Sequence, residues 1–218
     1  MNRKTLFIVA AIVLVLVFVG GTLYYTSHKQ DQSEQQAYSN RSALVRTHSP
    51  THGNQNAPVE IVEFIDPACE TCSVFYARVK QEILAANPDR IRLVLRYAPF
   101  HNGSDKVVAV LEAARKQDKF WPALEALLAS QADWAPHHTA QVDLVWPHLE
   151  GLGLDLDRVR ADMAAPEIAV LIAQDLADAA SLNVTMTPEY FVNGRPLPSF
   201  GYEQLQGLID EELAKAGS

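Results

Sequence analysis

A helix set between two buried strands constrains the fold of this chain more than any other feature of its sequence. Val59–Ile65 (VEIVEFI) and Ile91–Tyr97 (IRLVLRY) are rich in β-branched and apolar residues, as buried strands are. Between the strands, apolar residues recur at helical spacing at Cys72, Phe75, Tyr76, Val79 and Ile83. A strand–helix–strand unit of this kind joins two parallel strands by a right-handed crossover. We therefore expect an α/β fold.

Helical patterns fill the chain after the second strand and end where strand-forming residues return. Apolar residues recur at helical spacing, in several segments, from about residue 103 to about residue 182. Glu189–Val192 then has β character, and the following Asn193-Gly194 is the favoured two-residue hairpin turn. A last amphipathic helix is expected from Tyr202 to Ala214. This order predicts an α/β sheet with an all-helical insertion.

The N-terminus carries an uncharged apolar run of 20 residues, from Leu6 to Tyr25. A bilayer core of about 30 Å needs about 20 apolar residues in a helix. Arg3 and Lys4 precede the run, so the positive-inside rule places the N-terminus in the cytoplasm and the rest outside it. The alternative is a cleaved signal peptide, whose apolar region is shorter, about 7–15 residues. The sequence predicts an uncleaved, single-pass membrane anchor over residues 1–25.

Residues 26–56 separate the apolar run from the first strand. They are rich in Gln, Ser, His and Asn and hold few apolar residues, so they cannot bury enough surface to fold. A flexible chain of about 30 residues has a root-mean-square span of about 30 Å. We expect a flexible linker over residues 26–56, followed by the α/β domain over residues 57–218.

The net charge of the chain argues against one class of partner. The formal net charge is -8; residues 1–28 carry Arg3, Lys4 and no acid, so the remainder carries -10. Nucleic acid binding needs clustered Lys and Arg to meet the phosphates. The composition therefore predicts no nucleic acid partner.

The chain has two cysteines, Cys69 and Cys72, and three kinds of role are open to them. A structural disulfide would close a loop of four residues, where the gain in stability is small. A zinc site of this type needs a second Cys or His pair, and none of the seven His shows that spacing. Redox chemistry is the reading that we favour, and we expect no bound metal and no cofactor.

The position of the pair, between a strand end and a helix start, suits thiol chemistry. The free N–H groups and the dipole at a helix start stabilise an anion. Because the thiolate is the attacking species in exchange, a lowered pKa at Cys69 is what the chemistry needs. We expect Cys69 to be the exposed thiol that attacks, and Cys72, one turn inside the helix, to be the shielded thiol that resolves the mixed disulfide.

The segment EFIDPACETCSVFY resembles the active-site segment of the DsbA-like branch of the thioredoxin superfamily. Further matches are RYAPFH after the second strand, Lys119-Phe120-Trp121 in the helical block, and TPEYFVNG near the end. The resemblance covers most of Ala57 to Ala214. It implies a thioredoxin-like fold with a helical insertion and thiol–disulfide oxidoreductase activity. With the predicted anchor, we expect a single-pass protein of the bacterial inner membrane whose catalytic domain lies in the periplasm or otherwise outside the cytoplasm.

The resemblance also implies roles for three residues outside the cysteine pair. Pro188 matches the cis-proline that faces the cysteines, and the backbone of Thr187 would pair with a bound substrate peptide. Glu63 matches the family's buried acid, which accepts the Cys72 proton through water. The plain alternatives are a strand-start proline at Pro188 and a solvent-facing Glu63. We read His101, which follows a strand end, as an exposed polar loop residue.

The residues between the cysteines, Glu70 and Thr71, depart from the family's pattern. Strong oxidants of the family have Pro-His there, and thioredoxin has Gly-Pro. The negative charge of Glu70 opposes a second negative charge on Cys69. We therefore expect a higher Cys69 pKa and a weaker oxidant than the strong-oxidant members, and the direction of electron flow stays open among oxidase, reductase and isomerase.

Three functions are compatible with these residues. The leading one is a monomeric, membrane-anchored oxidoreductase that acts on cysteine-containing client proteins and is recycled by a membrane redox partner. The second is a copper-handling thiol protein for a membrane oxidase, although such proteins have three residues between their cysteines and a distal His. The third is a peptide-binding module without catalysis. An insulin-reduction assay beside a copper titration would separate them.

Overall fold

The computed structural model describes residues 12–22, 24–25, 35 and 40–217, and it divides the chain into two units, residues 1–39 and 40–218. In the first unit, residues 12–22 are helical and their large apolar side chains are exposed. Residues 6–11 and 23 of the expected anchor, and residues 26–34 and 36–39 of the expected linker, lie outside the described part. No helix within the described residues has the length and apolar character needed to cross a membrane.

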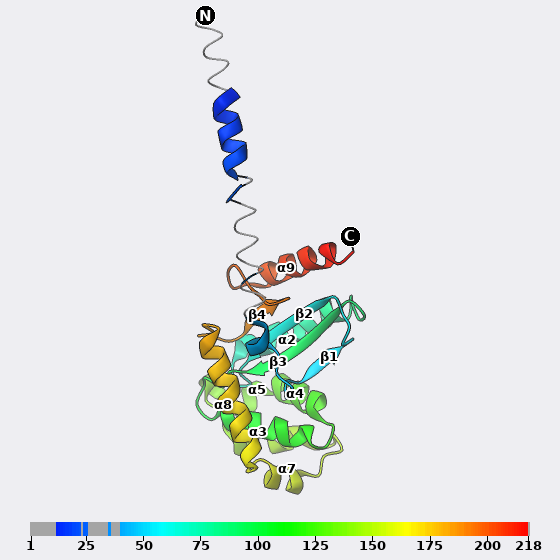
Figure 1. Cartoon of the computed structure of the whole chain (residues 1–218). Helices are drawn as coiled ribbons and strands as arrows, with labels where there is room; N and C mark the ends of the chain where they lie inside the picture. The colour runs from blue at the N-terminus through cyan, green and yellow to red at the C-terminus, as the bar shows by residue number, and fades with distance from the viewer. Residues whose placement is uncertain (1–11, 23, 26–34, 36–39, 218) are drawn as a thin grey trace, which may run out of the picture. The chain divides into compact units, whose positions relative to one another are not determined.

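The second unit is built on a sheet in the order β1-β3-β2-β4-β5 (Figure 1). The two expected strands, β2 (Val59–Ile65) and β3 (Ile91–Tyr97), lie parallel at its centre, which confirms the crossover. The edge strand β1 (Thr51–Gly53) pairs antiparallel with β3. On the other side, β4 (Glu189–Val192) pairs antiparallel with β2 and turns through Asn193-Gly194 into β5 (Arg195–Pro196).

Helices connect and cover these strands. The crossover begins as α2 (Glu70–Arg78) and ends as a π-helix, η1 (Val79–Leu84). The helices between β3 and β4 are α3 (Ser104–Arg115), α4 (Phe120–Ala129), α5 (Gln131–Trp134), η2 (Pro136–His138), η3 (Val142–Leu144), α6 (Trp146–Leu149), α7 (Leu156–Asp162) and α8 (Pro166–Ser181). The chain closes with α9 (Tyr202–Lys215).

The two faces of the central sheet pack against different elements. Side chains alternate between the faces along each strand. Ile61, Ile65 and Tyr190 point to one face, where they join the core formed with α2 and α9; we call it the α2 face. Val62 and Phe64 point to the other, where they meet Ala179 of α8 and Leu44; we call it the α8 face. The odd-numbered residues of β2, Glu63 among them, therefore point toward the helix that carries the cysteines.

The expected domain boundary at Ala57 is wrong, because residues 40–56 belong to the domain. Residues 40–44 are helical, and Leu44 is 1% exposed on the α8 face. Arg46 then pairs with Asp178 of α8 at 2.6 Å, and β1 adds a strand to the sheet. The polar composition concealed this docking, which depends on the buried Leu44, on contacts of Arg46 and His48 with carboxylates of α8, and on hydrogen bonds of the backbone.

Candidate active site

The two cysteines carry free thiols at the start of α2. Cys69 is the residue immediately before the helix, and Cys72 lies within its first turn. Cys72 has no exposed surface and Cys69 only 5%. The expectation of an exposed Cys69 is therefore wrong, although Cys72 is the more deeply buried of the two.

The protein treats the two thiols in opposite ways. Hydrogen bonding from the Cys72 thiol lowers the pKa of Cys69 to about 5 against the effect of burial, and the Thr187 side chain and the N–H groups of Cys72 and Thr71 add to this. Burial raises the pKa of Cys72 well above its ordinary value, and the neighbouring Cys69 raises it further. Near neutral pH the pair therefore holds one thiolate, at Cys69, and one thiol, at Cys72.

Thr187 lies against Cys69, and Pro188 follows it on the loop that leads into β4. The Thr187–Pro188 peptide bond is cis, which confirms that prediction. Cys69 Sγ lies 3.2 Å from the Thr187 carbonyl oxygen, which accepts a hydrogen bond from the protonated form of the thiol. The loop before β4 is thus in direct contact with the first cysteine.

Glu63 lies on β2 beneath the pair, and the solvent-facing alternative for it is wrong. Its side chain has no exposed surface. Burial raises the pKa of Glu63 to about 8, the Tyr190 side chain opposes that shift, and the charge at Cys69 adds to it. A carboxyl group with a pKa near 8 can both hold and release a proton close to neutral pH.

Glu70 and Thr71, between the cysteines, are exposed on the first turn of α2. Water screens the charge of an exposed carboxylate. The pKa of Cys69 is lowered to about 5 with Glu70 beside it. The Cys72 thiol and the N–H groups at the start of α2 thus lower the Cys69 pKa more than the charge of Glu70 can raise it. The expected dominance of Glu70 is therefore wrong.

Asp66 is a buried part of the site that the sequence analysis missed. Its carboxylate accepts hydrogen bonds from the Ala68 N–H at 2.9 Å and from the Ser104 hydroxyl. It also accepts from the N–H of His101 at 2.8 Å and contacts His101 Nδ1 at 2.7 Å. The Asp66 carbonyl accepts the Cys69 N–H at 3.0 Å. Asp66 therefore ties the cysteine loop to the loop after β3.

His101 is consequently not the free loop residue that we expected. Its side chain is 29% exposed, is held by Asp66, and stacks on His138 with 5.0 Å between ring centroids. Gln131 of α5 supports the same loop, since its side-chain amide donates to the carbonyl oxygens of Pro67 at 2.6 Å and Cys69 at 3.0 Å. In the sequence, only the position of Asp66, at a strand end and three residues before Cys69, could have indicated that Asp66 and His101 belong to the site.

Comparison with known proteins gives the same fold. A family model described as Thioredoxin matches residues 46–211. The probable disulfide bond formation protein D of Bacillus anthracis is 30% identical over 216 residues, which cover 93% of each protein. A solved thioredoxin-like oxidoreductase from Silicibacter pomeroyi DSS-3 is 31% identical, with a TM-score of 0.68 over 82% of this chain and 99% of that chain.

The chain also matches one region of a longer kind of protein. The Na(+)/H(+) antiporter NhaA 1 of Salinispora arenicola (strain CNS-205) is 36% identical over 166 residues, which are 74% of this chain and 24% of the antiporter. The chain spans less than a quarter of the length of the antiporters of this kind that it matches. The likeness therefore concerns only a part of those proteins.

A thioredoxin-like sheet with two thiols at a strand-to-helix junction defines a class, the dithiol proteins of thioredoxin-like fold. The matched family model covers most of the chain, and the relative from Bacillus anthracis matches over nearly its whole length. The chain belongs to the thioredoxin family and, within it, to the DsbA-like thiol:disulfide oxidoreductases.

Proposed function

We propose that this protein is a membrane-anchored enzyme that exchanges disulfides with the cysteines of other proteins through Cys69 and Cys72. The observation that carries the proposal is the split of the pair, with a pKa of about 5 at Cys69 and a raised pKa at Cys72. A structural disulfide has no use for a stabilised thiolate, whereas exchange begins with one.

Client binding comes first in the proposed reaction. An extended client segment pairs with the backbone at Thr187, whose carbonyl already contacts Cys69. This pairing brings a client sulfur to Cys69, which is 5% exposed. Pro188 holds the loop in the conformation that presents the Thr187 carbonyl to the thiol.

Exchange then proceeds through a mixed disulfide. In the oxidising direction, a client thiolate attacks Cys69 Sγ of the Cys69–Cys72 disulfide, and Cys72 leaves and takes up a proton. A second client thiolate then attacks the client sulfur, forming the client disulfide and releasing Cys69 as a thiolate. The protein gains two electrons and the client loses two. Glu63, beneath the pair, supplies the proton to Cys72 and takes it back in the reverse reaction.

The proposed direction is disulfide formation. Stabilisation of the Cys69 thiolate favours the reduced form of the site and makes its disulfide the stronger oxidant. The relative from Bacillus anthracis is named a probable disulfide bond formation protein. An oxidase must be reoxidised after each turnover, so we propose a membrane redox partner that accepts its electrons. No specific observation supports the copper-handling alternative, and the described residues contain no cluster of three metal-ligating side chains.

The proposed location is outside the cytoplasm, with the chain held by one N-terminal span. The 20-residue apolar run and the preceding Arg3 and Lys4 support it. A thiol reagent that does not cross membranes, applied to intact and to opened cells, tests the location. After brief reduction of the disulfide, labelling of Cys69 in intact cells is expected, and N-terminal sequencing of the mature protein that starts near Ser27 would contradict the anchor.

The activity is tested with the protein in its disulfide form and a reduced, unfolded client protein. We expect stoichiometric formation of client disulfides, lost when Cys69 or Cys72 is replaced by Ser. A wild-type protein that leaves the client thiols unchanged while it binds the client would favour the peptide-binding alternative.

A further inference from the structure

Tyr190 faces Glu63 directly across the sheet. The two residues are partners in the antiparallel register between β2 and β4. Directly opposed residues of an antiparallel pair place their side chains on the same face, with Cβ atoms about 4.5–5.5 Å apart. That face is the α2 face, because the Tyr190 ring stacks on Phe75 of α2 with 6.1 Å between centroids. The phenol and the carboxyl therefore share the space beneath the cysteines.

Both groups are buried and polar, and neither is paired. Glu63 and Tyr190 have no exposed surface. Within the described residues, neither oxygen of Glu63 nor the Tyr190 hydroxyl has a hydrogen-bond partner. A buried polar group without a partner destabilises the folded state, so such groups are rare and call for an explanation. Two of them on adjacent strands indicate one site rather than two packing faults.

The other titratable groups around Glu63 come from α2. Burial and the Glu63 charge both contribute to the raised pKa of Cys72, and Glu63 also contributes to the raised pKa of Tyr76. From β3, the residue opposite Glu63 is Leu95, which brings no charge. The remaining group that acts on Glu63 is Cys69, just before α2, whose charge raises the Glu63 pKa. In the part of the chain that the structure describes, none of these groups is a cation, and the Tyr190 side chain is the one that favours the ionised form of Glu63.

We propose that Tyr190 is a positioning residue for disulfide exchange, whose hydroxyl donates a hydrogen bond to the Glu63 carboxylate when that carboxylate exchanges a proton with Cys72. The inference rests on the proposed function, since it assigns a further residue to the same site. It goes beyond the acid itself, because it explains how a carboxylate can form in a place that lacks a cation.

The proton transfer belongs to the release of a mixed disulfide. Cys72 gives its thiol proton to the Glu63 carboxylate, which becomes the neutral acid. The Cys72 sulfur then attacks Cys69 Sγ, the bond between Cys69 and the client sulfur breaks, and the client leaves as a thiolate. The site is oxidised to the Cys69–Cys72 disulfide and the client sulfur is reduced. In the opposite direction, the leaving Cys72 takes the proton from Glu63.

The hydroxyl decides at which pH this step runs. Burial alone favours the neutral acid, which cannot accept a proton. The neighbouring Tyr190 side chain opposes burial, and the pKa of Glu63 is about 8. Removal of the hydroxyl raises that pKa and leaves less carboxylate near neutral pH. The aromatic ring, which packs on Phe75, is unaffected by that change.

The test follows the two releases of a coloured thiolate from an aromatic disulfide reagent mixed with the reduced protein at different pH values. The first release reports attack by Cys69, and the second reports the Cys72 step. In Tyr190→Phe, we expect the pH midpoint of the second release to rise by about one unit, as removal of a hydrogen bond to a charged group predicts. The first release should be unchanged.

Two variants make the result specific. Glu63→Gln should remove the pH midpoint of the second release, and Tyr190→Phe should then have no further effect. Tyr202→Phe is the matched control, because its ring also packs on Phe75 but its hydroxyl donates to Glu82 at 2.9 Å. It should behave as the wild type does.

An unchanged midpoint in Tyr190→Phe, an equal shift in Tyr202→Phe, or a second release slowed equally at every pH would overturn the role of Tyr190. Failure of the proposed function looks different: the wild type would show no first release that depends on Cys69.

Discussion

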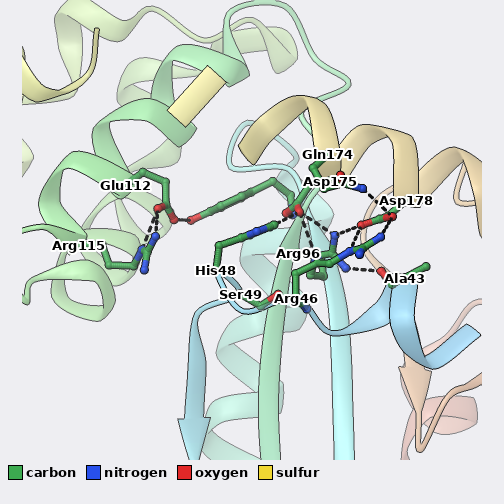
Figure 2. A network of polar contacts seen from close by, with 11 residues as sticks. Ala43, Arg46, His48, Ser49, Arg96, Glu112, Arg115, Gln174, Asp175 and Asp178 are labelled. Atoms are coloured by element: carbon green, nitrogen blue, oxygen red, sulfur yellow. Dashed lines mark hydrogen bonds and ion pairs between the residues drawn. The ribbon is translucent and has the colours of Figure 1, made fainter. Parts of the chain in front are cut away.

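The two faces of the central sheet hold buried charges under opposite conditions. On the α8 face, the fully buried Arg96 is held by Asp175 at 2.7 Å, by Asp178 at 2.6 Å and by the Ala43 carbonyl (Figure 2). On the α2 face, one strand away, Glu63 has no hydrogen-bond partner among the described residues. Both ionisable groups are removed from water, but only Arg96 has partners that compensate its charge.

The network on the α8 face ties distant parts of the chain together. Asp175 also contacts His48 at 2.6 Å and accepts the Tyr97 N–H at 2.8 Å, while the Tyr97 hydroxyl donates to Glu112 at 2.7 Å. Figure 2 shows Arg46 reaching Asp178 from the same segment as His48. Compensated charges thus hold the segment after residue 40 to β3 and α8, which is a structural task.

The difference indicates which buried charges do chemistry. A paired ion keeps one protonation state, because changing it would break the pair. An unpaired carboxyl group with a pKa of about 8 can change its state near neutral pH. In the proposed reaction Cys72 must gain and lose a proton, so the lack of compensation at Glu63, beneath the pair, fits that reaction. Replacing a charged residue on the α8 face should therefore change the stability of the protein, and replacing Glu63 on the α2 face should change disulfide exchange.

The largest effect is expected at the cysteines. Cys72→Ser should trap covalent adducts with client proteins, because a client bound to Cys69 can no longer be released. Cys69→Ser should trap few, since the pKa of the remaining Cys72 is raised and the thiol is buried. Non-reducing gels of cell extracts measure the adducts. Equal trapping by the two variants would refute the assignment of attacking and resolving thiols.

The α8 face should respond through stability alone. Asp175→Ala leaves the buried Arg96 without one of its carboxylates, and breaking a buried pair in this way costs about 3–5 kcal/mol. Urea unfolding measures the loss, and the pKa of Cys69 should stay where it is. The control is Asp157→Ala, which removes an exposed ion pair with Arg160 and should change little. A shifted Cys69 pKa in Asp175→Ala would contradict the claim that the α8 face contributes to stability and not to the chemistry of the cysteines.

Glu63→Leu should stabilise the protein in a pH-dependent manner. Folding raises the pKa of Glu63 from 4.5 to about 8, so between these values the folded state binds more protons than the unfolded state. The contribution of Glu63 to stability therefore falls as pH rises through this window. We expect a gain on the order of a few kcal/mol at pH about 8 and none below pH about 4.5.

The gain is measured as the difference in free energy of unfolding between Glu63→Leu and the wild type at each pH. Both proteins contain Cys69, so most of the contribution of its titration cancels in this difference. The same variant should slow the release of mixed disulfides. A stability difference that is constant from low to high pH would mean that Glu63 is not a buried titrating group.

The smallest effect is expected at Glu70. Glu70→His replaces an exposed negative charge next to Cys69 by a group that carries positive charge at low pH. The variant should be the stronger oxidant, with a slightly lower Cys69 pKa, but screening by water should keep the change in reduction potential within about 30 mV. Equilibration in glutathione buffers measures it. A shift toward a weaker oxidant would contradict the electrostatic reasoning.

Local patterns in the sequence predicted the central strands, the helical block and the hairpin, because each depends on residues close together in the chain. The resemblance of TPEYFVNG to a family motif predicted the cis bond before Pro188. Docking of residues 40–56 was not predictable in this way. It depends on Leu44 and Arg46 meeting residues of α8, more than a hundred positions away in the chain.

The site was predictable where a motif marks it and not where tertiary contacts build it. The spacing of Cys69 and Cys72 was visible, but the burial of Cys69 comes from the surrounding fold. Asp66 and His101 looked like ordinary loop residues, and their pairing follows from the approach of two strand ends. Tyr190 read as a strand residue, and only the register of β2 with β4 places it opposite Glu63.

The central claim is that the pKa of Cys69 is lowered while that of Cys72 is raised. Titrating the thiolate absorbance of the reduced protein near 240 nm tests it most directly. One thiolate per chain should appear with a midpoint of about pH 5 and be absent in Cys69→Ser. Cys72→Ala should keep that thiolate at a higher midpoint, because the donor that stabilises it is gone. A wild-type protein that forms no thiolate below pH about 8, close to the value of an unperturbed cysteine, would contradict the account.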